Sequence, residues 1–304
     1  MRTSVSLIFL FLFTTSLAHE YDDYFETVLN ITKEAGEIIK KKIWEVKNVK
    51  TKHSVVDFVT ETDKEIEEKI QSEISSKFSD HMFIGEESTD SGQKMELTDS
   101  PTWIIDPIDG TMNFVHGYPY VCISVALLVN KETQFGIIYD PLLDQLFTAR
   151  KGQGAFYNNK PMRVSTTKEL SEAVISTEIG LSREEEKLRV VTQNIKTLIP
   201  LAQGIRAVGA SAMNMALVAL GGSDAFYEFG LHAWDMAAGD ILIREAGGVV
   251  MDPSGGPFDL MSRRVLCAAT TELADQLRAK LQQYYPPRDV TITPSFDVIS
   301  IERN

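Results

Sequence analysis

The chain shows two kinds of hydrophobic spacing, one helical and one typical of strands. Over residues 24–44 apolar side chains recur every three or four positions, which predicts an amphipathic helix with a lysine-rich last turn. A second helical pattern covers residues 66–78, and Thr62 and Glu65 have the spacing of a capping box at its start. A short β-branched stretch at 55–60 lies between the two predicted helices.

The stretch at residues 103–114 combines the pattern of a buried strand with acidic side chains. Its apolar run ends in Asp106 and Asp109, and the neighbouring proline and glycine predict that the strand stops at a turn. Gly110 lets the backbone approach a ligand closely, and Thr111 can open a helix whose first N–H groups would bind an anion. The turn therefore brings carboxylates and free N–H groups side by side at the end of one strand.

Closely spaced strand patterns follow and then give way to alternating helices and strands. Strands are expected at 122–129, 134–139, 145–149 and 154–156. The short polar turns between them predict an antiparallel meander. Further along, the pattern predicts a helix at 182–198, a strand at 205–208, a helix at 209–220, a strand at 224–227, a helix at 231–245, strands at 249–251 and 265–268, and a last helix at 271–284. This order predicts an α+β fold or mixed α/β layers.

The composition is that of an acidic globular protein, with a formal net charge of −13 over 304 residues. This length suffices for one large domain or for two lobes. The negative charge argues against nucleic acid or an anionic membrane as a partner, because both would require a basic surface. An acidic protein can still bind a phosphate compound where bound metal ions reverse the local field.

Residues 1–18 have the pattern of a secretory signal peptide. A basic residue precedes an apolar stretch at 5–13 that is too short to span a bilayer, and a small-x-small cleavage site follows. Asn30 begins a glycosylation sequon, which agrees with a secreted or lumenal protein. A cytoplasmic location is the alternative, because Cys122 and Cys267 have the surroundings of free buried thiols. No other apolar stretch is long enough to provide a stable membrane anchor.

Each acidic candidate also has a purely structural interpretation. Asp106 and Asp109 could form an Asx-type turn before a helix cap, and Asp63 could simply stabilise the first turn of a helix. Glu86 and Glu87 follow another apolar strand and a glycine, where adjacent carboxylates are usually a solvated loop pair. In the functional interpretation Glu86 faces a cation and Glu87 faces away from it.

Four separated motifs resemble those of the inositol monophosphatase family. The first, Trp-x-x-Asp-Pro-Ile-Asp-Gly-Thr-x-Asn-Phe, begins at Trp103, and another, Trp-Asp-Met-Ala-Ala-Gly, begins at Trp234. Gly-Glu-Glu-Ser at 85–88 and Thr-Glu-Thr-Asp at 60–63 occur in the family's order. The resemblance covers roughly residues 20–285. Four motifs together are far more specific than a single short pattern.

This resemblance implies a layered α-β-α-β-α sandwich and a magnesium-dependent, lithium-sensitive phosphatase that forms a homodimer. The expected divisions are a signal peptide at 1–18, a catalytic domain at 19–286 and a C-terminal tail at 287–304. The expected reaction is hydrolysis of myo-inositol monophosphates by a metal-activated water, without a phosphoenzyme. The alternatives are another small phosphate monoester, such as a sugar phosphate or adenosine 3′,5′-bisphosphate, or a secreted binding protein that has lost catalysis.

Matching positions in the family's motifs assign roles to individual residues. Two or three Mg²⁺ ions are expected on an all-oxygen ligand set, which consists of Glu86, Asp106, the Ile108 carbonyl, Asp109 and Asp235. Glu86 is also expected to take part in catalysis. Thr111, paired with Asp63, is expected to orient the attacking water and to help deprotonate it.

The resemblance also assigns the substrate contacts. The phosphoryl group would contact the N–H groups of Gly110 and Thr111, and the metal ligands Asp109 and Asp235 are also expected to contact the substrate. The sugar ring would lie against the backbone of Gly209, Ala210 and Ser211, although close relatives often have Thr and Ala at the last two positions. Glu228 matches the glutamate that accepts hydrogen bonds from inositol hydroxyls. The nearly neutral segment around Glu228 favours a polyol over a nucleotide.

Overall fold

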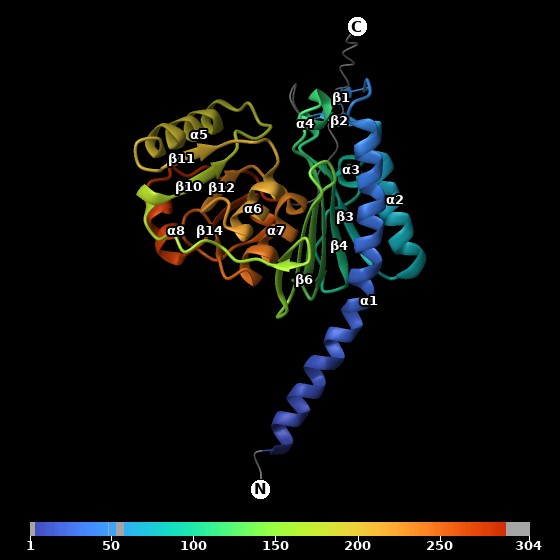
Figure 1. Cartoon of the computed structure of the whole chain (residues 1–304). Helices are drawn as coiled ribbons and strands as arrows, with labels where there is room; N and C mark the ends of the chain where they lie inside the picture. Colours follow the sequence, from blue (N-terminus) through green and yellow to red (C-terminus); the bar gives the residue numbers. More distant parts are fainter. Residues whose placement is uncertain (1–3, 48, 53–57, 290–304) are drawn as a thin grey trace.

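The computed structural model describes residues 4–47, 49–52 and 58–289, with side chains from Tyr21 onward. Within these residues the strands form a seven-stranded sheet, β3-β4-β5-β6-β7-β8-β9, a five-stranded sheet, β11-β10-β12-β14-β13, and a β1-β2 pair. Figure 1 shows the two large sheets side by side, with helices between them and on both outer faces. The layers therefore follow the order α-β-α-β-α, which confirms the expected fold class.

The seven-stranded sheet contains the predicted meander. Its strands are β3 (Met82–Gly85), β4 (Thr102–Asp109), β5 (Cys122–Val129), β6 (Glu132–Asp140), β7 (Gln145–Arg150), β8 (Gly154–Tyr157) and β9 (Lys160–Pro161). Strands β4 to β9 pair antiparallel in chain order, whereas β3 lies parallel to β4. The predicted turn after Asp106 is instead a register shift between Asp106 and Asp109, so the strand continues through both carboxylates.

Two long helices, α1 (Ser4–Lys42) and α2 (Glu61–Lys77), cover the outer face of this sheet (Figure 1). Their apolar stripes pack against it, and Ile39 of α1 and Ile70 of α2 are fully buried in one cluster with Trp103 of β4. Burial of one stripe on each helix is what the helical spacing of the apolar residues predicts.

Both helices begin earlier than the sequence pattern predicts. Residues 4–23 continue α1 toward the N-terminus because no proline or glycine interrupts the chain there. Helix α2 begins at Glu61, so its capping box is formed by Thr60 and Asp63, and the predicted pair of Thr62 and Glu65 is wrong. Residues 4–18 of the predicted signal peptide lie in the part of α1 that projects from the body in Figure 1, and cleavage of the peptide stays a prediction. None of the described helices is both long and apolar enough to cross a membrane.

The middle layer consists of α6 (Ser211–Leu220) and α7 (Ala233–Glu245), packed between the two sheets. Helix α7 lies directly on the seven-stranded sheet, since a Cβ added to Gly136 of β6 would meet the Ala238 Cα at 2.8 Å. The Ser124 hydroxyl of β5 donates to the Trp234 carbonyl at 3.0 Å. These contacts hold the first turn of α7 beside the ends of β4 and β5.

The five-stranded sheet closes the other side of the molecule. Its strands are β10 (Val174–Thr177), β11 (Gly204–Arg206), β12 (Ala225–Phe229), β13 (Val249–Met251) and β14 (Arg264–Ala268). Helices α5 (Glu185–Leu198) and α8 (Thr271–Arg278) cover its outer face (Figure 1). The sequence pattern missed β10 and made α8 six residues too long. The remaining short elements are β1 (Val49–Thr51), β2 (Phe58–Thr60), α3 (Glu86–Asp90), α4 (Thr111–His116), and the 3₁₀ turns η1 (Leu170–Glu172) and η2 (Leu260–Ser262).

Candidate active site

Three carboxylates meet where β4 ends against the first turn of α7. Asp106 and Asp109 come from β4 and Asp235 from α7, and one oxygen of each lies within 4.8 Å of the others. Asp106 also accepts a hydrogen bond from the Ile108 N–H at 3.0 Å, which stabilises the irregular end of the strand. The structure thus brings together residues that are 126 positions apart in the chain.

Asp109 is held in place by the middle layer. Its carboxylate accepts hydrogen bonds from the backbone N–H groups of Ser211 at 3.1 Å and Ala212 at 2.7 Å, at the start of α6. These donors have no partner inside the helix, so Asp109 caps α6 from another part of the chain. The buried Cys122 thiol lies 3.6 Å from the same carboxylate.

Asp235 is held by its own helix and by the C-terminal segment. It accepts a hydrogen bond from the His232 N–H at 2.6 Å, which closes the N-terminal turn of α7. The His232 ring contacts the Asp289 carboxylate at 2.8 Å, and Asp289 also accepts from the Ala233 N–H at 3.2 Å. Asp289 is almost completely buried, although the sequence analysis assigns it to a tail. It is therefore part of the support of this site.

The carboxylate cluster has the electrostatics of a cation site. Burial, together with repulsion from neighbouring carboxylates, raises the pKa of Asp106 and of Asp235 well above the usual range. Burial also raises the pKa of Asp109 to about 7. Buried like charges at this separation repel one another unless a cation lies among them. Carboxylate and carbonyl oxygens are hard ligands, so the donor set fits a divalent ion such as Mg²⁺.

Thr111 and Asp63 form a pair beside the cluster. The Thr111 hydroxyl lies 3.1 Å from the Asp63 carboxylate and 3.0 Å from the Ile108 carbonyl. Asp63 is completely buried, its pKa is raised to about 6 by burial, and it accepts a second hydrogen bond from the Thr60 N–H at 2.9 Å. Asp63 therefore caps α2 and contacts the Thr111 hydroxyl at the same time, so its structural and functional interpretations are both compatible with this geometry.

A second cluster of three acidic side chains surrounds Lys52. The Lys52 ammonium lies 2.7 Å from Glu86, 2.6 Å from Glu87 and 2.7 Å from Asp90. The solvated pair expected at Glu86 and Glu87 is wrong, because both lie in helix α3 and Glu87 is buried, with its pKa raised to about 9 by burial. Glu86 is close enough to raise the pKa of Asp106, although its carboxylate groups with Glu87 and Asp90 around Lys52. Lys52 carries no signal in the sequence, because nothing in a short polar loop marks a buried cation.

Comparison with known proteins decides the family. The inositol monophosphatase family matches residues 20–285. Inositol monophosphatase 1 of Homo sapiens is 46% identical over 275 residues, which are 90% of this chain and 99% of the human protein. Inositol monophosphatase 2 of Rattus norvegicus is 47% identical over 270 residues, 88% of this chain and 93% of the rat protein. The solved structure of a Thermotoga maritima IMPase has a TM-score of 0.77 at 33% identity, covering 85% of this chain and 96% of that one.

The chain belongs to the inositol monophosphatase family.

Membership confirms the family predicted from the four motifs and makes the protein a phosphatase, an enzyme that hydrolyses phosphate monoesters. Metal dependence is expected of an inositol monophosphatase, and the buried carboxylates agree with it. The prediction of a secreted binding protein without catalysis is not supported, since each carboxylate of the predicted ligand set lies in or beside the cluster.

The residues that the family resemblance assigns to substrate lie next to the carboxylates. Gly110 and Gly209 are close together, since a Cβ added to Gly110 would meet the Gly209 carbonyl at 3.1 Å. Ser211 connects the two halves of the site: its N–H donates to Asp109, and its hydroxyl donates to Glu228 at 2.7 Å. Burial raises the pKa of Glu228 to about 8. Ala210, which lies between Gly209 and Ser211 in the chain, is buried, and its Cβ would lie 3.4 Å from a Cβ added to Gly110.

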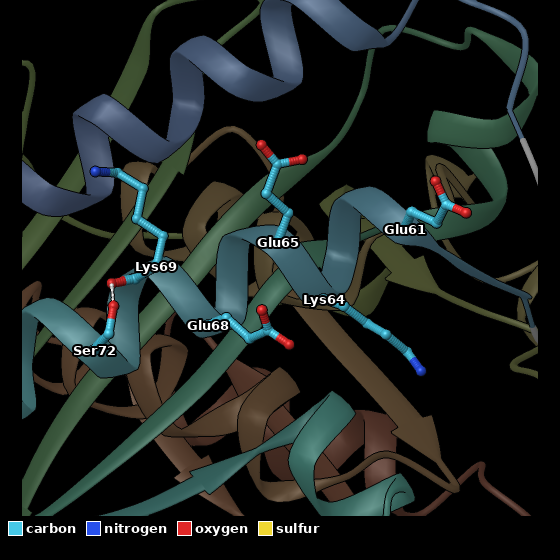
Figure 2. A pocket seen from close by; sticks show the side chains of 6 residues that line it. All are labelled: Glu61, Lys64, Glu65, Glu68, Lys69 and Ser72. Atoms are coloured by element: carbon cyan, nitrogen blue, oxygen red, sulfur yellow. Dashed lines mark hydrogen bonds between the residues drawn. The ribbon is translucent and has the colours of Figure 1, made fainter.

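A separate hollow lies on the outer surface of α2. It has a cavity volume of about 560 Å³, and Figure 2 shows it lined by Glu61, Lys64, Glu65, Glu68, Lys69 and Ser72. These side chains are the polar, solvent-facing stripe of an amphipathic helix, and Lys69 pairs with Glu34 of α1 at 3.0 Å. None of the predicted site residues lines this hollow, so it is distinct from the candidate active site.

Proposed function

We propose that the protein hydrolyses myo-inositol monophosphates to myo-inositol and inorganic phosphate. One arrangement carries this proposal. A carboxylate cluster suited to cations is joined through Ser211 to Glu228, a carboxylate suited to sugar hydroxyls. The first group would bind the phosphate end of a substrate and the second its polyol end. The substrates named for the most similar relatives agree with this assignment.

The metal would be Mg²⁺, held by Asp106, Asp109, Asp235, Glu86 and the Ile108 carbonyl in a set of two or three ions. When bound, such ions lower the pKa of water and neutralise charge on a phosphate ester. Without metal, the carboxylate cluster would repel a phosphate dianion, so we expect metal to bind before the substrate or together with it.

The chain's own residues would orient the nucleophile and the phosphoryl group. The Thr111 hydroxyl, in contact with Asp63, would position the attacking water, and Asp63 would receive its proton. A pKa of about 6 leaves Asp63 mostly deprotonated at neutral pH, as a base requires. The N–H groups of Gly110 and Thr111 would hold phosphate oxygens at the start of α4.

Glu228 would provide the selectivity for a polyol. In its ionised form, which a pKa of about 8 places at mildly alkaline pH, Glu228 accepts hydrogen bonds only, so it suits substrate hydroxyls and disfavours a second phosphate group. Sugar phosphates share this chemistry and are the second candidate substrates. Adenosine 3′,5′-bisphosphate fits less well, because its second phosphate would face a carboxylate.

Four further expectations come from the resemblance and from the N-terminal pattern. The protein would form a homodimer, and lithium would inhibit it. A signal peptide at 1–18 would direct it to the secretory route, with cytoplasmic residence as the alternative. The C-terminal division at 286 would move beyond Asp289, because this residue supports α7.

A substrate panel tests the proposal. Purified enzyme would be given inositol 1-phosphate, glucose 6-phosphate, fructose 1,6-bisphosphate and adenosine 3′,5′-bisphosphate, each with Mg²⁺ and with EDTA. The expected result is the highest kcat/KM for inositol 1-phosphate and no turnover in EDTA. A higher kcat/KM for any other substrate would overturn the proposed specificity, and unchanged turnover in EDTA would overturn the metal requirement.

A further inference from the structure

Lys187 is a buried lysine on the inward face of helix α5. The neighbouring residues 184–186 are exposed, but Lys187 is only 1% exposed, and it starts the buried stripe that continues through Val190, Val191 and Leu198. Burial lowers the pKa of its ammonium. Among the described residues none accepts a hydrogen bond from this ammonium, and none forms a salt bridge with it. The Nζ atom is not among the described polar atoms that are both enclosed and without a partner, so it keeps a small access to solvent through which a substrate acceptor can reach it.

Two glycines make room for the Lys187 ammonium. A Cβ added to Gly180 would lie 2.4 Å from the Lys187 Nζ, and a Cβ added to Gly230 would lie 2.8 Å from it. Both glycines have positive φ, +70° and +91°, a conformation that other residues rarely adopt. The ammonium therefore occupies a niche that the backbone leaves open at the ends of β10 and β12.

The niche adjoins the polyol side of the candidate active site. The added Cβ of Gly180 would also lie 3.3 Å from Glu228 Oε1, so the ammonium and this carboxylate oxygen both lie beside Gly180. They do not pair directly, and the other Glu228 oxygen accepts from the Ser211 hydroxyl at 2.7 Å. Ser211 in turn contacts Asp109. A continuous line of contacts thus runs from the carboxylate cluster to the space beside Lys187.

Charge decides which substrate group suits this space. Besides Lys187, the charged groups that act on it are Glu228, Arg263, Arg183 and Glu184, and Glu178 acts on Glu228. Asp109 also acts on Glu228, so four acids accompany the three bases Lys187, Arg263 and Arg183. Arg263 is also engaged with the Leu231 carbonyl at 3.0 Å and lies 3.4 Å from Asp289. An environment without a surplus of positive charge favours a neutral hydroxyl over a second anionic group, since an anion would face Glu228.

We propose that Lys187 is a specificity-determining residue whose ammonium donates to the same substrate hydroxyl that donates to Glu228. A hydroxyl group can accept one hydrogen bond while donating another, whereas an ammonium only donates and a carboxylate only accepts. One hydroxyl oxygen between them satisfies both. This inference rests on the proposed function and deepens it: the preferred substrate carries a ring hydroxyl that reaches this space.

Steady-state kinetics on two substrates test the inference. Wild type, Lys187→Met and Lys196→Met would be compared on inositol 1-phosphate and on glycerol 2-phosphate, which lacks a ring hydroxyl. Lys196 is an exposed lysine on the same helix and serves as the matched control. Lys187→Met should lower kcat/KM for inositol 1-phosphate by about tenfold to a hundredfold, as expected for a lost charge-assisted hydrogen bond, and should leave glycerol 2-phosphate within about twofold.

A double-mutant cycle with Glu228→Gln distinguishes a shared hydroxyl from separate contacts. If both residues hold one hydroxyl, the losses in the double variant should be clearly smaller than the product of the two single losses. Independent effects would overturn the shared contact. Lys187→Arg, which keeps the charge, should retain more selectivity than Lys187→Met.

Other outcomes separate the two proposals. Equal losses on both substrates, with inositol 1-phosphate still hydrolysed by wild type, would make Lys187 structural and overturn only this inference. No hydrolysis of inositol 1-phosphate by wild type would overturn the proposed function and the inference with it. A wild-type preference for an inositol bisphosphate that disappears in Lys187→Met would assign the lysine to a second phosphate instead.

Discussion

The two halves of the candidate site are built in different ways. The cation half takes Asp106, Asp109 and Thr111 from six consecutive residues at the junction of β4 and α4, and it adds Asp63 of α2, Glu86 of α3 and Asp235 of α7. The polyol half takes Ser211, Glu228 and Lys187 from α6, β12 and α5. The central carboxylates of the cation half are therefore close together in the sequence. Selectivity depends instead on how three elements that are distant in the sequence pack together.

The largest effect should come from the cation half. Asp106→Asn should lower kcat/KM by several orders of magnitude, because it removes a central carboxylate of the cluster, while thermal unfolding shows that the fold survives. Asp275→Asn, at an exposed aspartate of α8, is the matched control. Wild-type activity in Asp106→Asn would show that this cluster is not the catalytic centre.

Glu228→Gln should have a smaller and more selective effect. The variant keeps the size of the side chain but weakens its acceptor, so we expect the preference among polyol phosphates to change by about tenfold to a hundredfold. The kcat for a small substrate such as glycerol 2-phosphate should change much less. An unchanged ranking across the substrate panel would mean that Glu228 does not select the substrate.

Asp289→Ala tests whether the C-terminal segment belongs to the cation half. The substitution leaves the His232 ring and the Ala233 N–H without their buried acceptor, so the first turn of α7 should hold Asp235 less firmly. The Mg²⁺ concentration for half-maximal activity should rise by about tenfold, as for other residues that orient metal ligands. If Mg²⁺ dependence stays the same while stability falls, Asp289 has a structural role only.

The stabilising effect of Mg²⁺ should grow with pH. The folded-state pKa of Asp63 is about 6 and that of Asp109 about 7, above the ordinary value of about 3.9. Between these values the folded state binds more protons than the unfolded state, so the metal-free protein loses stability as pH rises. A bound cation removes this penalty. The gain in Tm on adding Mg²⁺ should be larger at pH 7.5 than at pH 5, by a few degrees; an equal gain at both pH values would contradict this account.

Removal of residues 1–18 should have the smallest effect. Every residue of the candidate site lies at or after Lys52, so kcat/KM should stay within about twofold of the full chain. N-terminal sequencing of the protein from its own cells would test cleavage near His19. A chain that begins at Met1, with Asn30 unglycosylated, would overturn the predicted signal peptide.

Much of the fold and of the cation half could be predicted from the sequence. Apolar spacing predicted both helices on the outer face of the seven-stranded sheet, the meander and both helices of the middle layer. The errors lie mainly at the ends of elements. Asp106, Asp109 and Thr111 were recognisable because their chemistry depends on short-range spacing. The capping box was misplaced because Thr60 and Thr62 offer the same cap chemistry, and only the start of α2 at Glu61 distinguishes them.

Other features depend on contacts that no local pattern contains. Charged side chains are normally expected at solvated positions. Three of them, Lys52, Lys187 and Asp289, are instead buried against residues far away in the chain. The sequence by itself determined which groups could bind a cation and a phosphate, because spacing within one strand and one turn places them. Only the tertiary structure decided which charges are buried together beside Glu228, because burial of a charge depends on how separate helices and strands pack around it.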